Sequence, residues 1–369
     1  SRQGSVFFFF LFSFSPLAAL AGFFAVCAGW AGCAVLREGA LGSMNCLPAS
    51  LLAFSALTRV QTELPCAASM ELKTAFLSSS SASAASPHEA ALAAGAQLVP
   101  DHAVRAARDG CLVFDRDRQA GPFDLIIDAA GAGSPLSPMV VRPLPYGALW
   151  ATVDWPEDAA LPRNELRQMY RRADRMVGVL PIGELPDTEG RKAAIFWSLP
   201  ATAHDSWRAH GLKAWREEAC ALWPAFAPFA AQITDPDQMT MARYAHGTLR
   251  RPTAPGLAQI GDAAHRASPQ LGQGANMALL DADALCRAVA RARGDVTLAL
   301  RWYAQARRWH VRAYQTMSRL FTPQYQSDSR WLPVLRDRVL FPVSQIPPVP
   351  RVLTRLVCGD LVPPLGSLD

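Results

Sequence analysis

The chain has 369 residues, of which half are apolar and 18% are charged, enough for one large domain or two of ordinary size. This composition excludes a disulfide-stapled small protein, a collagen-like repeat and a wholly disordered chain. The net charge of +5 comes from 36 basic and 31 acidic residues with no long basic run, so no nucleic-acid partner is predicted. The eight cysteines stand singly, without CxxC pairs or zinc spacing, which predicts no metal site and favours a reducing, cytoplasmic location.

The first 87 residues differ in composition from the rest of the chain. They hold seven of the 67 charged residues, and Val6–Leu36 holds none. Three interpretations of Val6–Leu36 stay open: a membrane-spanning helix, a signal peptide behind Arg2, or a buried strand followed by a nucleotide-binding helix. Membrane association through this segment is therefore an open alternative to a purely cytoplasmic protein. Because the chain does not begin with Met, we expect a fragment or a processed form.

The nucleotide-binding interpretation depends on a partial dinucleotide fingerprint. The apolar run 23–26 predicts a buried strand, and Cys27–Gly32 follows it with Gly29 and Gly32 in place and Cys27 instead of the first glycine. In such a fingerprint the second glycine lets the backbone approach a pyrophosphate, and the third lets the helix pack on the strand. The acidic residue expected about 20 positions later is missing, so an alanine- and glycine-rich helix without a cofactor is an equal alternative.

From residue 88 onward the chain has the pattern of an ordinary soluble domain. A short helix is predicted over 88–96, a hairpin over 104–114 and a buried strand over Phe123–Asp128. The last strand ends in the small-residue turn 129–134, which holds Gly131. Small residues directly after an apolar strand are where a parallel sheet admits a ligand, although an ordinary glycine turn is the simpler interpretation.

The block 140–250 predicts a second sheet and a helix. An amphipathic helix is predicted over Trp207–Trp223, ending before Pro224. The many aromatic residues suit an apolar pocket over a ligand, although most of them belong in a core. The predicted strands are 149–153, 176–180, 193–199 and 239–245.

The most informative stretch runs from 257 to 285. A short strand over 257–260 leads into Gly261–His265, and a helix begins at about Ala275. A carboxylate such as that of Asp262, at the carboxyl end of a strand, can accept a hydrogen bond from a sugar or ribityl hydroxyl. The loop Gly272–Gly274 exposes backbone N–H groups at a helix N-terminus, which favours anionic ligand atoms. A simple turn cap is the alternative for Asp262, and we interpret His265 as a packed structural residue.

Beyond the loop, the sequence predicts helices to the end of the chain. Gly294 ends the first helix and Asp295 caps the next, an amphipathic helix over Val296–Phe321. Tyr303, His310 and Tyr314 recur at helical spacing and are interpreted as core. Arg307-Arg308 is interpreted as part of a solvated face, and the Pro-rich tail as turns and short helices.

The stretch 261–282 resembles a known family. Gly261-Asp262-Ala263-Ala264-His265, Pro269, Gly272–Asn276 and Asp281-Ala282 together resemble the second flavin motif of class A flavoprotein monooxygenases, which include para-hydroxybenzoate hydroxylase and the ubiquinone-biosynthesis hydroxylases. The resemblance implies that Asp262 contacts the ribityl chain of FAD and that the loop lies beside the pyrophosphate and the flavin ring. The FAD-binding residues that it implies here are Gly261, Asp262, Pro269, Gly272, Gln273, Gly274, Ala275 and Asn276.

The turn 128–134 stands where the family has its middle motif, Asp-Gly-x-x-Ser. Gly131 and Ser134 match, Ala130 replaces the aspartate, and Asp128 lies two residues earlier. The family associates this motif with both FAD and NAD(P)H, so the departure bears on nicotinamide handling. Gly29, Gly32 and Gly131 complete the predicted cofactor site.

The resemblance implies an α/β fold: a Rossmann-like FAD-binding domain (88–139 and 251–295), an interleaved α+β substrate domain (140–250) and a C-terminal helical region (296–369), after an atypical segment 1–87. It also implies an FAD-dependent monooxygenase that uses NAD(P)H and O2 to hydroxylate an aromatic or lipophilic small molecule. No catalytic residue can be assigned from the sequence. A flavin-dependent dehydrogenase or reductase of the same fold, and a non-catalytic remnant unable to bind FAD, are the alternatives.

Overall fold

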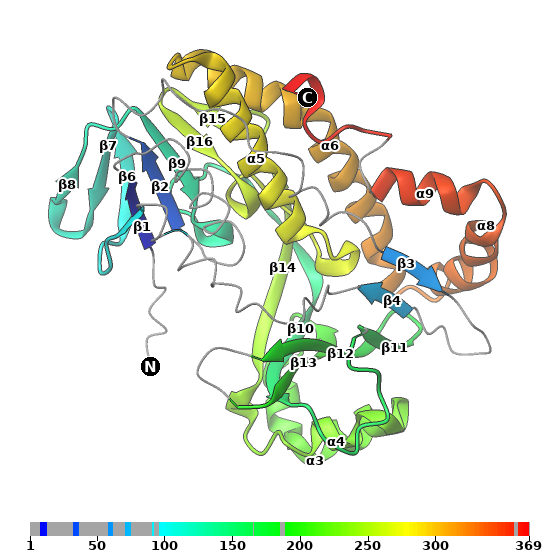
Figure 1. The fold of residues 1–369 in the computed structure, drawn as a ribbon. Helices are drawn as coiled ribbons and strands as arrows, with labels where there is room; N and C mark the ends of the chain where they lie inside the picture. The colour runs from blue at the N-terminus through cyan, green and yellow to red at the C-terminus, as the bar shows by residue number, and fades with distance from the viewer. Residues whose placement is uncertain are drawn as a thin grey trace.

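The computed structural model describes residues 8–12, 32–36, 58–61, 71–74, 91, 96–164, 166–184, 189–357 and 361–368. Within these ranges two six-stranded sheets and a set of C-terminal helices make a mixed α/β fold, as the sequence predicts (Figure 1). The limits of the predicted domains stay predictions.

The first sheet carries the strands that lead into the predicted flavin loop. Strands β9 and β16 run parallel, so their carboxyl ends meet at one edge, whereas β2 is antiparallel to β9 and parallel to β1. The carboxyl ends of parallel strands are where open α/β sheets bind ligands. In order across the sheet, the strands are β15 (Thr253–Ala254), β16 (Leu257–Gln259), β9 (Leu125–Ala129), β2 (Gly32–Leu36), β1 (Phe8–Phe12) and β5 (Ala96–Leu98).

Two small antiparallel sheets accompany the large ones. The predicted hairpin over 104–114 is confirmed, and its turn places Asp109 and Gly110 at positive φ. Its strands are β6 (Val104–Arg108), β7 (Cys111–Phe114) and β8 (Gln119–Ala120), and the second small sheet pairs β3 (Thr58–Gln61) with β4 (Glu71–Thr74).

The second large sheet confirms the strands predicted in 140–250. Residues on one face alternate into a core with helices α3 (His204–Leu222) and α4 (Ala227–Ala230), through side chains such as Trp197 and Phe226. Helix α3 ends at Leu222, with Trp223 as its C-cap, so it stops before Pro224 as predicted. The strands, in order, are β11 (Arg167–Arg171), β12 (Arg175–Glu184), β13 (Arg191–Pro200), β10 (Arg142–Asp154), β14 (Thr240–Thr248) and β17 (His265–Arg266).

Strand β14 of the second sheet extends to the turn that follows β16 of the first sheet. Its end, Gly247–Thr248, pairs with His265–Arg266, which directly follow the turn after β16. The second sheet therefore includes residues from both sides of position 250 and reaches the predicted flavin loop (Figure 1).

Helices α5 (Gly274–Ala292) and α6 (Val296–Tyr325) cover the first sheet (Figure 1). Arg293 and Gly294 both take positive φ where α5 ends, so the predicted turn at Gly294 begins one residue earlier. The Asp295 carboxylate accepts a 2.8 Å hydrogen bond from the Leu298 N–H, which confirms the predicted N-cap.

The Pro-rich tail forms short helices, as predicted. They are α7 (Leu332–Leu335), a π-helical turn (Arg336–Leu340), α8 (Phe341–Gln345) and α9 (Val349–Val357). Among the described residues, no helix combines the length and the hydropathy needed to cross a bilayer. Strands β1 and β2 fall inside Val6–Leu36; the strand predicted over 23–26 lies outside the described residues.

Candidate functional site

The site lies at the edge of the first sheet where β9 and β16 end. Each strand is followed by a tight turn, Gly131–Gly133 after β9 and Gly261–Ala263 after β16. The Arg266 guanidinium donates a 3.3 Å hydrogen bond to the Ala132 carbonyl and so ties the two turns together. The structure therefore brings the predicted residues Gly131 and Asp262 to the same edge.

Asp262 presents its carboxylate to the outside of the turn. The side chain is exposed, and the described part of the chain offers its carboxylate no hydrogen-bond partner. Partial desolvation raises the pKa of Asp262 above its ordinary value, while His265 and Arg266 act in the opposite direction. A carboxylate placed in this way is free to accept hydrogen bonds from a ligand.

The loop between the turn and α5 is open on its outer side. Pro269 begins a short 3₁₀ turn that Ser268 caps, and Gly272 follows in the left-handed conformation with φ 62°. A Cβ atom added to Gly272 or Gly274 would meet no atom of the described residues within 4 Å. The loop therefore leaves space for another molecule to lie against its backbone.

The N-terminus of α5 directly follows this loop. No side chain caps the helix, and the N–H groups of Gly274, Ala275 and Asn276 have no acceptor in the described structure. The Asn276 side chain donates instead to the Gln273 carbonyl oxygen Oε1 at 2.9 Å. Free N–H groups at a helix N-terminus favour a negatively charged ligand group.

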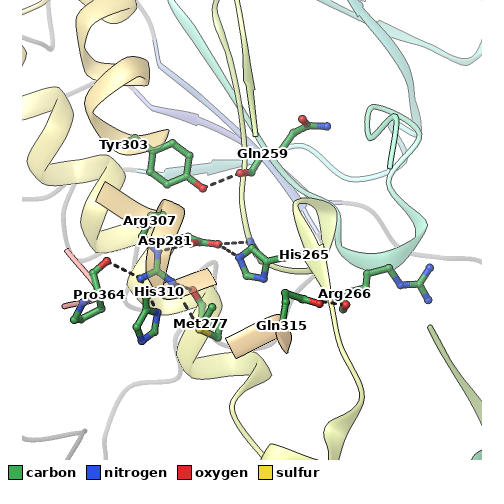
Figure 2. Close-up of polar contacts among 11 residues, drawn as sticks. Gln259, His265, Arg266, Met277, Asp281, Tyr303, Arg307, His310, Gln315 and Pro364 are labelled. Carbon is green, nitrogen blue, oxygen red and sulfur yellow. Dashed lines mark hydrogen bonds and ion pairs between the residues drawn. The ribbon is translucent and has the colours of Figure 1, made fainter. Parts of the chain in front are cut away.

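A buried carboxylate, Asp281, fixes the turn to the helices (Figure 2). It is fully buried and accepts hydrogen bonds from the Gly261 N–H at 2.8 Å, His265 Nε2 at 2.6 Å and Arg307 Nε at 2.7 Å. Burial raises the pKa of Asp281, but the charges and hydrogen bonds of His265 and Arg307 outweigh this and hold it at about 2. His265 is thus a structural residue, as interpreted from the sequence.

Arg307 does not lie on a solvated face, and that interpretation was wrong, although the adjacent Arg308 is exposed. Its guanidinium is buried and donates to the Pro364 carbonyl at 2.7 Å as well as to Asp281 (Figure 2). Arginine is seldom buried unless it is paired, and Asp281 supplies the pair. Burial and the Arg307 charge lower the pKa of the neighbouring His310 to about 4.

Sequence reasoning missed the roles of Asp281 and Arg307, whereas the core position expected for Tyr314 is confirmed. Tyr314 is buried on α6, and burial together with the nearby Asp262 charge raises its pKa to about 12. The signal for Asp281 was its place between Met277 and Leu285 on the apolar stripe of α5, where an acidic residue needs a buried partner.

The middle motif, residues 128–134, forms a turn that is closed by side-chain hydrogen bonds in this chain. The buried Asp128 carboxylate accepts hydrogen bonds from the Ala130 N–H at 3.1 Å and from Ser134 Oγ at 2.6 Å. Burial raises the pKa of Asp128 above its ordinary value. Gly131 has φ 71°, a conformation that favours glycine, so the motif folds into a turn closed by Asp128.

The structure does not bear out the helix expected at Gly32. Gly32 begins strand β2 and pairs with Ala129, which places it at the same edge as Gly131. Gly32 therefore begins a strand, whereas a fingerprint glycine acts where a strand passes into a helix. Gly29 lies outside the described residues.

Comparisons with known proteins agree with this geometry. Residues 158–317, which include the loop, Asp281 and Arg307, match the FAD binding domain family. The match covers 160 of the 369 residues of the chain. The comparison with curated proteins finds no significant match.

Solved structures show what fold the chain shares with known proteins. HpxO of Klebsiella pneumoniae, solved with FAD and uric acid, is 22% identical over 72% of this chain and 67% of its own, with a TM-score of 0.56. A tetrameric 2-methyl-3-hydroxypyridine-5-carboxylic acid oxygenase is 17% identical over 83% of this chain and 90% of its own, with a TM-score of 0.55. The probable FAD-dependent monooxygenase PqsL of Pseudomonas aeruginosa is 22% identical over 64% of this chain and 65% of its own, with a TM-score of 0.50. The fold is that of FAD-dependent monooxygenases, and the chain spans about two thirds of the length of PqsL and HpxO.

Proposed function

We propose that this chain binds FAD at the edge formed by the Gly261 turn and the loop 269–276, and hydroxylates a small aromatic or lipophilic molecule with NAD(P)H and O2. The observation that carries the proposal is the unpartnered Asp262 carboxylate beside an open glycine loop and an uncapped helix N-terminus. The match of residues 158–317 to the FAD binding domain family supports it. HpxO with uric acid and PqsL with 2-aminobenzoylacetate support a small organic substrate.

The residues present suit the chemistry of FAD. Asp262 would accept a hydrogen bond from a ribityl hydroxyl, and the N–H groups of Gly274–Asn276 would face the anionic pyrophosphate. The absence of a Cβ at Gly272 and Gly274 lets a flat molecule approach the backbone. Pro269 and Gly131 would border the site at the start of the loop and at the neighbouring turn.

The chain's own part in the reaction is to bind the cofactor and to shield its site from water. When bound, FAD supplies the electron transfer between NAD(P)H, O2 and the substrate. Asp281 holds the Gly261 backbone in position through its 2.8 Å hydrogen bond, so the carboxylate of Asp262 stays at the edge of the sheet. Asp281, His265 and Arg307 are buried and bonded to one another, so they would close the region behind the turn to water.

We place the substrate on the face of the second sheet opposite α3. On this face Trp150 packs on Phe196, with ring centroids 4.6 Å apart, and its indole N–H donates to the Tyr244 hydroxyl at 2.8 Å. Burial raises the pKa of Tyr244, so the hydroxyl keeps its proton and can donate it to an acceptor on a substrate. Tyr244 lies on β14, whose end pairs with His265–Arg266 beside the flavin loop.

The proposal is tested by FAD binding to Asp262→Ala, measured through quenching of flavin fluorescence. Asp158→Ala is the matched control, because Asp158 is also exposed and lies away from the loop. Losing hydrogen bonds to a charged group costs about 1.5–3 kcal/mol, so we expect affinity to fall about ten- to a hundred-fold in Asp262→Ala and to stay unchanged in the control. Equal FAD affinity in the two variants would overturn the site.

FAD binding, flavin reduction by NAD(P)H and product analysis together separate the alternative functions. A folded wild-type chain that binds no FAD would identify a non-catalytic remnant. FAD that is reduced by NAD(P)H, but produces no hydroxylated product from any of a set of small aromatics, would favour a dehydrogenase or reductase of the same fold. The use of NAD(P)H is proposed from the resemblance alone. In the middle motif, Asp128 and Ser134 hydrogen-bond to each other, so these two side chains do not add support for it.

A further inference from the structure

The exposed apolar side chains of this protein gather on its C-terminal helices. Of the twelve exposed large apolar side chains among the described residues, nine lie between residues 331 and 361. Soluble monomers seldom expose contiguous apolar patches of more than a few hundred Å² unless the patch binds something. We name this set the C-terminal patch: Trp331, Val334, Leu335, Val339, Leu340, Val343, Ile346, Val352 and Leu361.

One side of the helical run 332–345 is fixed to the protein, and the patch lies on the other. Arg336 is buried, stacks its guanidinium over Tyr325 at 4.9 Å and Tyr170 at 5.6 Å, and donates to the Gln324 carbonyl at 2.9 Å. Leu335, Val339 and Val343 follow one another at intervals of four residues and are all exposed. Because Arg336 holds the run in place, the apolar side is presented to the outside in a fixed orientation.

Helices α8 and α9 lie beside α6, on the side of the molecule away from the first sheet (Figure 1). None of the nine residues of the C-terminal patch belongs to the proposed flavin site.

The charge around the patch is positive. Residues 328–361 contain five arginines and three aspartates, of which Asp337 pairs with Arg336 at 2.6 Å. Arg330, Arg338 and Arg351 are exposed among the apolar side chains. A second copy docking through the same patch would bring its own arginines against these, and like charges at an interface are repulsive. The patch therefore fits a partner that is apolar inside and negatively charged at its surface.

We propose that the C-terminal patch docks the protein on the surface of an anionic lipid bilayer. An amphipathic helix with apolar and arginine residues lies in the plane of the interface, with its apolar side among the acyl chains and its basic residues near the phosphates. Trp331, which is 81% exposed, suits the headgroup region that tryptophan prefers. Docking of this kind needs no spanning helix and does not involve Val6–Leu36.

Sedimentation with lipid vesicles tests the proposal on the full chain. We expect binding to vesicles with about 30% phosphatidylglycerol and weaker binding to pure phosphatidylcholine or in about 0.5 M NaCl. Trp331→Ser/Val339→Ser/Ile346→Ser should bind the anionic vesicles at least about tenfold more weakly. The control Val140→Ser/Trp309→Ser, which removes exposed apolar residues outside the patch, should bind like the wild type.

A second variant tests the charge separately. Arg338→Gln/Arg351→Gln keeps the apolar side chains and should weaken binding about fivefold for each arginine. Circular dichroism and thermal unfolding verify that each variant is folded. Absence of binding to anionic vesicles, or equal binding by the wild type and the triple serine variant, would overturn the proposal. A wild-type dimer that the triple variant dissociates, with vesicle binding unchanged, would assign the patch to a second copy and would also overturn it.

Discussion

Replacing Asp281 with asparagine should destabilise the protein strongly, because one buried carboxylate holds three elements together. It accepts hydrogen bonds from the Gly261 N–H, His265 and Arg307, and the neutral amide of the variant would leave Arg307 buried without its counter-charge. Breaking a buried ion pair on one side costs about 3–5 kcal/mol. The lowering of the Asp281 pKa from 3.8 to about 2 separately corresponds to about 2 kcal/mol of stabilisation of the charged form. We therefore expect Asp281→Asn to lose about 3 kcal/mol of unfolding free energy.

Urea unfolding at pH 7, followed by circular dichroism, measures this loss. The matched control is Asp283→Asn on the same helix, whose carboxylate is half-buried and pairs with Arg287 at 3.2 Å. A pair of this kind, one helical turn apart, contributes only about 0.3–0.5 kcal/mol. Equal losses in the two variants, or a loss below about 1 kcal/mol in Asp281→Asn, would refute the reasoning about the buried network.

The pH dependence gives a second test of the same network. Because the folded pKa of Asp281 lies below its unfolded value, the stabilisation is complete above the unfolded pKa and is lost as the pH falls toward 2. The difference in stability between the wild type and Asp281→Asn should therefore shrink between about pH 4 and pH 2. A difference that stays constant over that range would show that the Asp281 charge is not its source.

Two further predictions concern the Gly261 turn and the His310 side chain beside Arg307. Gly261→Ala should lose about 1–2 kcal/mol in urea unfolding and weaken FAD binding, because Gly261 has φ 57° and an added Cβ would lie 3.1 Å from that of Ala278. Gly274→Ala, whose added Cβ meets none of the described atoms, should lose no unfolding free energy, and equal losses of unfolding free energy in the two variants would contradict the argument. The His310 imidazole, with its pKa lowered to about 4 by burial and by Arg307, should remain neutral at about pH 5.5 in an NMR titration. Folding favours this neutral form, so its contribution to stability should fall as the pH drops from 6.5 toward 4; a midpoint near 6.5 would contradict the burial.

The elements that the sequence predicted well are those with local signals. The hairpin turn Asp109-Gly110, the N-cap Asp295 and the end of α3 before Pro224 each depend on a few neighbouring residues. The strands of the second sheet alternate because one face packs on α3 and α4, which is visible in the sequence as a period of two. The ordered residues of Gly261–Asn276 likewise place a turn, a loop and a helix N-terminus in one short stretch.

The contacts that the sequence did not predict join distant segments. Arg307 lies 26 residues after Asp281 and donates to a carbonyl 57 residues further on, at Pro364, so helical periodicity alone placed it on the surface. Gly32 was assigned to a helix because its glycine pattern is also found in fingerprints, whereas its pairing with Ala129 depends on a strand almost 100 residues away. Sheet neighbours and buried ion pairs are long-range features that a local pattern does not encode.

The most direct test of FAD binding is the visible absorption spectrum of the purified chain after incubation with FAD and removal of free cofactor. Flavin released by denaturation is then quantified against protein. We predict flavin absorption and close to one FAD per chain, because the Gly261 turn, the open loop and the N-terminus of α5 are in place together. A folded, colourless chain that retains no FAD under these conditions would contradict it.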